Sequence, residues 1–204
     1  AEIKNRSNIL AKYESRDTGK PITLASKVDI PRAIENFNFF ANFSENFYLE
    51  SNIESEASIS SVSKQALGVV GCISPWNLPL YLFTWKIAPA LIVGNTVLAK
   101  PSEITPLTAS KLAAICLDIG LPKGVLNIVN GSGQVAGDLL VKNKNIKAIS
   151  FTGGTDTGKQ IYQNSYASLK KLSLEMGGKN PAIIFEDCNY DSMLKTVVKS
   201  CLLY

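Results

Sequence analysis

The first part of the chain, up to about Leu49, carries apolar residues at helical spacing, which predicts two helices. The segment Asp17–Pro21 separates them, because it contains the glycine and the proline that interrupt helices. The second helix is predicted to begin near Pro31, since proline is tolerated in a first helical turn. The apolar stripes of the two helices are formed by Ile9, Leu10 and Tyr13 and by Ile34, Phe37 and Phe40.

Residues 50–64 differ from their surroundings, because they are rich in serine and glutamate and poor in large apolar side chains. This composition favours an exposed excursion or extended arm, with a disordered linker as the weaker alternative. From Leu67 onward the pattern becomes regular again. The sequence therefore predicts a helical part (1–49), an extended arm (50–66) and a main domain (67–204).

The main domain alternates short apolar runs with amphipathic segments, which indicates strands alternating with helices. The best-marked helix runs from Pro106 to Ile119, with Thr105 as its expected cap and Gly120 and Pro122 as stop signals. Its apolar stripe consists of Leu112, Ile115, Cys116 and Ile119. This alternation predicts an α/β fold with a Rossmann-like, doubly wound parallel sheet covered on both faces. The predicted strands are Gly68–Ile73, Thr96–Ala99, Val125–Val129, Lys147–Phe151, Lys171–Leu174 and Ala182–Phe185.

The composition narrows the classes of function. Hydrophobic residues make up 46% of the chain and charged residues 19%, so the chain can bury a core. The net charge of +4 is mild, and no basic run is long enough to predict a nucleic-acid partner. No apolar run approaches the ~20 residues that cross a bilayer, and no secretory signal opens the sequence, so we expect no membrane partner.

The histidines and cysteines limit the chemistry further. Histidine is absent, which excludes a Ser-His-Asp or Cys-His mechanism within these residues and removes the commonest metal ligand. The four cysteines form no C-x-x-C pair, which argues against a disulfide framework or a zinc site. We therefore expect no metal and a reducing compartment, the cytoplasm. The cysteines are Cys72, Cys116, Cys188 and Cys201.

Two loops that follow predicted strands carry polar groups suited to binding, and parallel sheets bind ligands at the carboxyl ends of their strands. Ser74–Asn77 is either a packed turn or a rigid loop from which the Asn77 amide donates to a developing oxyanion. Lys100–Glu103 presents a cation and a carboxylate three residues apart. The Glu103 carboxylate can accept from both ribose hydroxyls of an adenosine and would repel a 2′-phosphate, which favours NAD over NADP. The alternative is a surface Lys–Glu pair at the start of a helix.

Two further loops are rich in glycine. Gly131–Gly137 has the pattern G-x-G-x-x-x-G, one residue longer than the dinucleotide fingerprint, and is weak evidence by itself. Phe151–Lys159 joins a strand to a helix, whose first N–H groups can face an anion. Gly153–Lys159 also satisfies the G-x-x-x-x-G-K part of a P-loop, and Ile183–Asp187 resembles a strand that ends in a metal-binding acid. A nucleotide triphosphatase is thus a rival, although Gln160 stands where a P-loop needs a serine or threonine for magnesium.

The last segment with chemical content is Leu174–Pro181. It places Glu175 between an apolar strand and a Gly-Gly turn, an unusual position for an incidental surface charge. We expect this carboxylate to form a buried ion pair or to act as a general base with a raised pKa.

Taken in order, these segments resemble the aldehyde dehydrogenase superfamily over essentially the whole chain. Leu174–Lys179 is similar to the glutamate signature of the superfamily, with Met176 where leucine is usual. Pro75–Asn77, Lys100–Glu103 and Phe151–Gly154 follow at the expected intervals. Longer strings are similar to the aminomuconate-semialdehyde dehydrogenases of the kynurenine pathway, namely Ile73–Tyr81, Trp85–Pro89, Lys171–Glu175 and Asn180–Asp187.

The resemblance implies an enzyme that oxidises an aldehyde to the carboxylic acid with NAD, through a cysteine thioester. It implies that Asn77 supplies the side-chain half of an oxyanion hole and that Glu175 is the general base. Lys100 and Glu103 would hold the adenosine ribose, and Gly133 would line the adenine slot. The other cofactor-binding residues that it implies are Ser74, Trp76, Gly153, Gly154, Thr157 and Met176.

One departure from the family pattern concerns the phosphates. Gly153 and the helix start at Gly154 would carry the pyrophosphate, and many relatives have serine at the latter position. Glycine lacks the hydroxyl that bonds a phosphate but keeps the backbone N–H, so we expect at most a modest change in cofactor affinity.

The resemblance places the nucleophilic cysteine beyond Tyr204, after a Gly-Gln turn. Cys201 comes too early and Cys188 lies in an acidic turn, so neither is expected to be the catalyst. We therefore expect an incomplete NAD-binding domain at 67–204, no catalytic domain, and no activity of these residues alone. The full-length parent is expected to be a homo-oligomer, a dimer or tetramer, that acts on a small-molecule aldehyde such as a semialdehyde. The alternatives are a non-catalytic dinucleotide-binding protein and the P-loop hydrolase.

Overall fold

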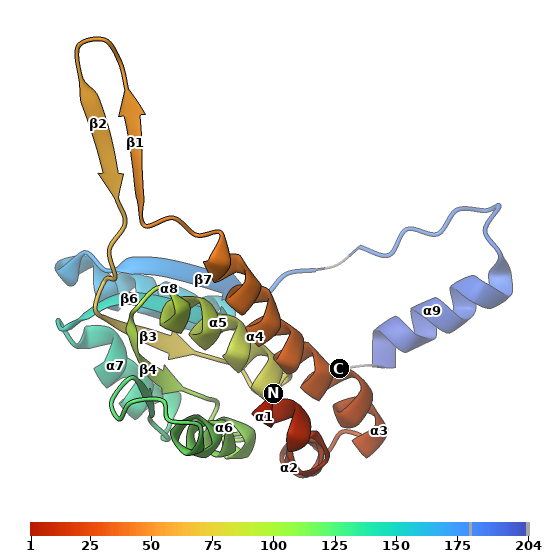
Figure 1. Cartoon of the computed structure of the whole chain (residues 1–204). Helices are drawn as coiled ribbons and strands as arrows, with labels where there is room; N and C mark the ends of the chain where they lie inside the picture. Colours follow the sequence, from red (N-terminus) through yellow and green to blue (C-terminus); the bar gives the residue numbers. More distant parts are fainter. Residues whose placement is uncertain (180, 203–204) are drawn as a thin grey trace.

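The computed structural model describes residues 1–179 and 181–202, without the side chain of residue 202. Its centre is a parallel sheet of five strands, and an antiparallel two-stranded sheet lies outside it (Figure 1). The central strands are β3 (Val69–Ile73), β4 (Thr96–Lys100), β5 (Leu126–Ile128), β6 (Ile146–Gly153) and β7 (Lys171–Met176).

The strands of the central sheet lie in the order β5-β4-β3-β6-β7. The chain starts the sheet at β3 in the middle, adds β4 and β5 on one side, and then returns to add β6 and β7 on the other. The order reverses between β3 and β6, and open α/β sheets bind ligands at this switch point. The predicted doubly wound parallel sheet is confirmed, and β3 to β7 fall on five of the six predicted strands.

Two hydrophobic cores cover the two faces of the sheet. The larger one packs α2, α4, α5 and α6 against β3 and β4, with Leu10, Phe83 and Leu112 fully buried. The smaller one packs α7 and α8 against β6 around Leu140 and Phe151. None of the helices in the described residues is long and apolar enough to span a membrane. The helical elements are α1 (Glu2–Asn5), α2 (Ser7–Thr18), α3 (Ile22–Leu24), η1 (Ala25–Asp29), α4 (Ile30–Glu45), α5 (Pro79–Ile92), α6 (Leu107–Asp118), η2 (Gly133–Gly137), α7 (Asp138–Lys142), α8 (Thr155–Ser165), η3 (Tyr166–Ser168) and α9 (Tyr190–Leu202).

The two predicted N-terminal helices correspond to α2 and α4. Helix α2 ends at Gly19, whose φ of 74° places it in the left-handed region that favours glycine at a helix end. Helix α4 carries Pro31 in its first turn, as predicted. The expected stripe of α2 is only partly buried, because Leu10 faces the core whereas Ile9 is exposed.

The start of α6 differs from the prediction. Thr105 does not cap the helix; its hydroxyl donates to the Trp76 carbonyl oxygen at 3.4 Å. The free N–H of Leu107 donates instead to the Asp17 carboxylate at 2.8 Å. A cap supplied by α2, which packs against α6 but lies far away in the sequence, satisfies the same orphan donor, and local sequence contains no signal for it. At the other end of α6 the predicted core residue Ile119 is exposed.

The segment between α4 and the central sheet forms a hairpin of β1 (Glu50–Glu54) and β2 (Ile59–Ser63). All its strand residues are exposed, and it projects away from the sheet (Figure 1). Serine and glutamate make up most of the two strands, which suits solvated faces, although Ile53, Ile59 and Val62 are exposed as well.

The sixth predicted strand, Ala182–Phe185, is wrong. These residues have no strand partner in the described chain, and Ile183, Ile184 and Phe185 are exposed. A strand needs the hydrogen bonds of a neighbouring edge, and an apolar run cannot supply them alone. The segment instead leads away from β7 to α9, which stands apart from the sheet (Figure 1).

A buried carboxylate joins three of the helices on the larger core. Glu14 on α2 is fully buried and accepts hydrogen bonds from the Leu80 N–H at 3.2 Å and the Thr108 hydroxyl at 2.7 Å. Burial raises the pKa of Glu14 from 4.5 to about 7, while the hydrogen bonds from Thr108 and Leu80 act in the opposite direction. The folded state therefore binds this proton more tightly than the unfolded state does.

We expect Glu14 to make stability fall with rising pH. The contribution of Glu14 to the free energy of unfolding is fully present below pH 4.5 and is lost as the pH rises through about 7. The loss amounts to roughly 3 kcal/mol. Glutamine carries no charge, so Glu14→Gln should remove this pH dependence. Above pH 7 the variant should have a higher free energy of unfolding relative to the wild type than it has below pH 4.5. Urea unfolding of both proteins on either side of the window measures the difference, and parallel pH profiles would contradict the assignment.

Candidate functional site

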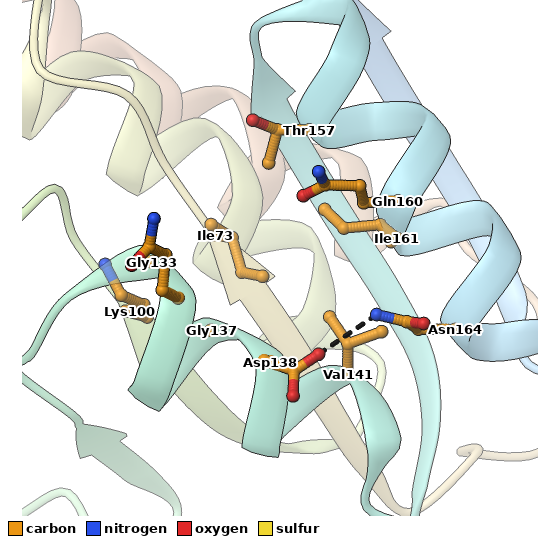
Figure 2. A pocket seen from close by; sticks show the side chains of 11 residues that line it. Ile73, Lys100, Gly133, Gly137, Asp138, Val141, Thr157, Gln160, Ile161 and Asn164 are labelled. Atoms are coloured by element: carbon orange, nitrogen blue, oxygen red, sulfur yellow. Dashed lines mark hydrogen bonds between the residues drawn. The ribbon is translucent and has the colours of Figure 1, made fainter.

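A cavity of about 390 Å³ lies at the switch point, where β3 ends at Ile73 and β4 ends at Lys100. Figure 2 shows Lys100 and Gly133 on one side of this cavity and the α8 side chains of Thr157 and Gln160 on the other. The volume falls in the range of small-molecule sites. We call it the switch-point pocket.

An ion pair at the end of β4 lies on one side of this pocket. Lys100 is buried, and its Nζ lies 3.1 Å from Glu103 Oε2. The other carboxylate oxygen accepts from the Gly133 N–H at 3.2 Å. The pKa of Glu103 lies below its ordinary value, first because of its own backbone N–H and further because Lys100 and Gly133 donate to it. The structure thus brings together three of the predicted residues, with an ionised carboxylate at the centre.

The glycine loop after β5 closes this side of the pocket. Ser132 caps η2 by accepting from the Val135 N–H at 3.3 Å. Gly137 is buried, and a Cβ there would stand in ordinary contact with the Lys100 side chain at 3.8 Å. The loop therefore packs closely on the lysine stem, while the Gly133 N–H donates to Glu103.

The start of α8 forms the opposite side. Gly154 is its N-cap in an extended conformation, and Thr157 in the first turn lines the pocket. Gly153 precedes the cap at the end of β6, where a Cβ would meet the Phe151 ring. The first N–H groups of α8 have no partner within the helix, which suits an anion at this end.

Six predicted cofactor-binding residues lie outside the lining of the pocket, and three of these, Glu103, Gly153 and Gly154, lie directly beside lining residues. The other three are Ser74, Trp76 and Met176. Ser74 is buried beside the pocket, and its backbone N–H donates to the Lys100 carbonyl at 3.2 Å. Trp76 is 55% exposed on the loop after β3. Met176, at the end of β7, lies against Gly158 and lines a shallow hollow with Leu174. The Ser74 hydroxyl is buried and has no hydrogen-bond partner among the described residues.

The two predicted catalytic residues lie at the ends of different strands. Asn77 follows β3, and its buried Oδ1 has no partner among the described residues. Glu175 lies in β7 opposite Thr152 of β6, and it lines a second cavity of about 450 Å³ on the face of the sheet that α5 covers. Glu175 is exposed and forms no ion pair in the described chain, so the expected buried ion pair is wrong. The reason is its position on an edge strand, which leaves one side open.

A lysine that sequence reasoning missed shares this second cavity. Lys86 is buried on α5, and its Nζ lies 3.3 Å from the Ser150 hydroxyl. Burial lowers the pKa of Lys86, while Cys72 and Glu175 act in the opposite direction. The available signal was a single lysine inside the apolar helix Pro79–Ile92.

The P-loop alternative finds no support in the geometry. A P-loop lysine reaches the phosphates, whereas Lys159 is exposed, points away from the switch-point pocket and lies 3.8 Å from Asp156. The strand expected before the acidic pair Glu186 and Asp187 does not form. Gln160 lines the pocket in place of a magnesium-binding hydroxyl.

The fold and the pocket define an α/β protein of the doubly wound class, with a ligand site at its switch point. The model of the aldehyde dehydrogenase family matches residues 1–204, and the chain belongs to this family. It is 49% identical over 191 residues to 2-aminomuconic semialdehyde dehydrogenase of Homo sapiens. The aligned region covers 93% of this chain and 39% of the human protein. It is 42% identical to 2-aminomuconic 6-semialdehyde dehydrogenase of Pseudomonas sp, over 99% of this chain and 42% of that protein.

Solved structures agree with this assignment. A putative aldehyde dehydrogenase from Burkholderia cenocepacia superposes with a TM-score of 0.94 at 39% identity, over 98% of this chain and 41% of that one. A point mutant of betaine aldehyde dehydrogenase from Staphylococcus aureus, in complex with NAD+, superposes with a TM-score of 0.92 at 37% identity. The match covers 97% of this chain and 40% of that one. The chain spans about two-fifths of the length of these relatives. The family resemblance identified from the motifs is confirmed.

Proposed function

We propose that the chain forms the NAD-binding part of an enzyme that oxidises an aldehyde to a carboxylic acid. The observation that carries this proposal is the cluster of Lys100, Glu103 and Gly133 at the switch-point pocket. An ionised carboxylate at the end of the second strand suits the hydroxyls of a ribose and opposes a 2′-phosphate. The pocket volume suits an adenosine.

The chain's own groups account for each part of the cofactor. Glu103 and Lys100 hold the adenosine ribose, and Gly133 lies beside the base. The first turn of α8, with Gly153, Gly154 and Thr157, faces the pyrophosphate. Ser74, Trp76 and Met176 are proposed as its outer contacts. When bound, NAD supplies the acceptor for the aldehyde hydride.

Two side chains are proposed to act on the substrate. The Asn77 amide donates a hydrogen bond to the oxygen that gains negative charge, because its oxygen end is buried and the nitrogen end is the donor. Glu175 accepts a proton from the thiol or from hydrolytic water, since it is exposed at an open side of the sheet. The buried Lys86, which lines the same cavity as Glu175, is proposed as a positioning residue for this carboxylate.

The described cysteines do not provide the nucleophile. Cys72 and Cys116 are buried in the larger core, and burial raises the pKa of Cys72 to about 12. Cys188 and Cys201 are exposed on the segment that leads to and forms α9, away from the sheet. The thiol that forms the thioester is therefore proposed to come from outside the described residues.

The substrate is proposed to be a semialdehyde such as aminomuconate semialdehyde, a proposal supported by the similarity to semialdehyde dehydrogenases.

We also propose the domain limits 1–49, 50–66 and 67–204. Within the part of the chain that the structure describes, the outer edges of the β1–β2 hairpin are unpaired, which supports a homo-oligomer, a dimer or tetramer. The absence of disulfides among the described residues supports a cytoplasmic location.

The reaction is tested by the appearance of NADH in the presence of the complete enzyme and an aldehyde. We expect NADH formation to depend on the aldehyde and to be faster with aminomuconate semialdehyde than with betaine aldehyde. A lack of NADH with every aldehyde would contradict the proposed activity, and a preference for betaine aldehyde would contradict the proposed substrate.

A further inference from the structure

The side of the switch-point pocket farthest from Lys100 is polar in a way that ribose and phosphate binding do not explain. Gln160 and Asn164 stand one turn apart on α8, and Asp138 opens α7 opposite them. Figure 2 shows these three side chains around the end of the pocket that is lined by Val141 and Ile161.

The polar side chains are held in one arrangement. Asn164 Nδ2 donates to Asp138 Oδ1 at 3.0 Å, and Lys142 Nζ lies 2.8 Å from the other oxygen of the same carboxylate. A carboxylate only accepts hydrogen bonds, so the Asp138 side chain fixes which end of the Asn164 amide is its nitrogen. The Asn164 Oδ1 is therefore the end left to act as an acceptor.

The remaining residues at this end are apolar, which suits the faces of an aromatic base. Val141 and Ile161 are buried and apolar, and Ile73 adds a further apolar wall from β3. The ribose groups lie at the other end, on Lys100 and Glu103. A nucleoside that places its ribose there directs its base past Gly133, at the start of η2, toward α7 and α8.

We propose that Asn164, oriented by Asp138, selects adenine by accepting a hydrogen bond from its 6-amino group, with the Gln160 amide donating to a ring nitrogen. This inference rests on the proposed binding of NAD. Adenine presents a donor at position 6, whereas hypoxanthine presents a carbonyl oxygen that Asn164 Oδ1 cannot satisfy. The Asn164 Oδ1 then faces another acceptor in place of a donor, so binding is weaker because the hydrogen bond is lost and the two oxygens repel each other.

The test is calorimetric titration of the full chain with NAD and with nicotinamide hypoxanthine dinucleotide. We expect the wild type to bind NAD about tenfold or more tightly than the hypoxanthine analogue. Asn164→Leu should reduce this ratio to about twofold or less, chiefly by weakening NAD. Asp138→Asn keeps the size of the side chain but allows the Asn164 amide to turn over, so it should also reduce the ratio.

Gln163→Leu is the matched control, because Gln163 lies on the same helix and lines the hollow beside Met176 instead. It should leave the ratio unchanged. Equal binding of the two dinucleotides by the wild type would overturn the adenine selection while leaving the proposed function intact. An unchanged ratio in Asp138→Asn would overturn the orienting role of Asp138. Binding of neither dinucleotide would overturn the proposed function, and the selection with it.

Discussion

Glu175→Gln is expected to lower the rate of aldehyde oxidation by about 10²- to 10⁴-fold, the range that a general base contributes. Glutamine keeps the size and the hydrogen-bonding oxygen of the side chain but cannot take up the proton. Glu175 stands on the edge strand β7, where water reaches it. Hydrolysis of the thioester should suffer most, so single-turnover kinetics of the complete enzyme should retain the NADH burst while steady-state turnover falls.

The control for this prediction is a glutamate outside the site. Glu45 is exposed at the end of α4, and Glu45→Gln should leave turnover unchanged. NAD affinity should change by less than about twofold in Glu175→Gln, because a remote carboxylate contributes little to cofactor binding. Equal losses in NAD binding and turnover would mean that Glu175 has a structural role.

The second large effect is expected on the choice between NAD and NADP. Glu103→Gln should reduce the preference for NAD by about ten- to a hundredfold, since hydrogen bonds to a charged group contribute about 1.5–3 kcal/mol. The variant loses the charge that opposes a 2′-phosphate and weakens the links to Lys100 and Gly133. Dissociation constants for both dinucleotides measure the ratio.

The neighbouring Ser102→Ala provides the matched control for Glu103. Its hydroxyl makes no hydrogen bond among the described residues, so the NAD/NADP ratio should stay at the wild-type value. If Glu103→Gln leaves the ratio unchanged, the carboxylate does not contact the ribose, and the ligand lies elsewhere in the pocket.

Much of the fold could be predicted because its signals are local. The strands β3 to β7 are short apolar runs between turn residues, and their alternation with helices predicts a parallel sheet but not the order of its strands. Ala182–Phe185 has the same pattern but forms no strand, because the pattern does not show whether the segment pairs with an edge of the sheet. The cap that Asp17 provides for α6 was equally invisible, since the two residues are far apart in the chain.

The candidate site likewise contains some contacts that the sequence predicts and others that only the fold shows. Lys100 and Glu103 stand three residues apart after one strand, so their pairing could be predicted from the sequence. The Asp138–Asn164 pair and the Lys86–Ser150 pair join distant segments and become visible only in the fold. The burial expected for Glu175 was wrong, because an apolar strand followed by glycines does not reveal whether it lies at an edge of the sheet.

The central claim is that the switch-point pocket binds NAD, and calorimetric titration of the chain with NAD tests it most directly. We expect saturable binding at one site in the wild type. Thr157→Trp should abolish it without altering the circular dichroism spectrum, because Thr157 is an exposed α8 residue whose enlargement fills the pocket. The absence of saturable heat in the wild type, or unchanged NAD binding by Thr157→Trp, would contradict the account.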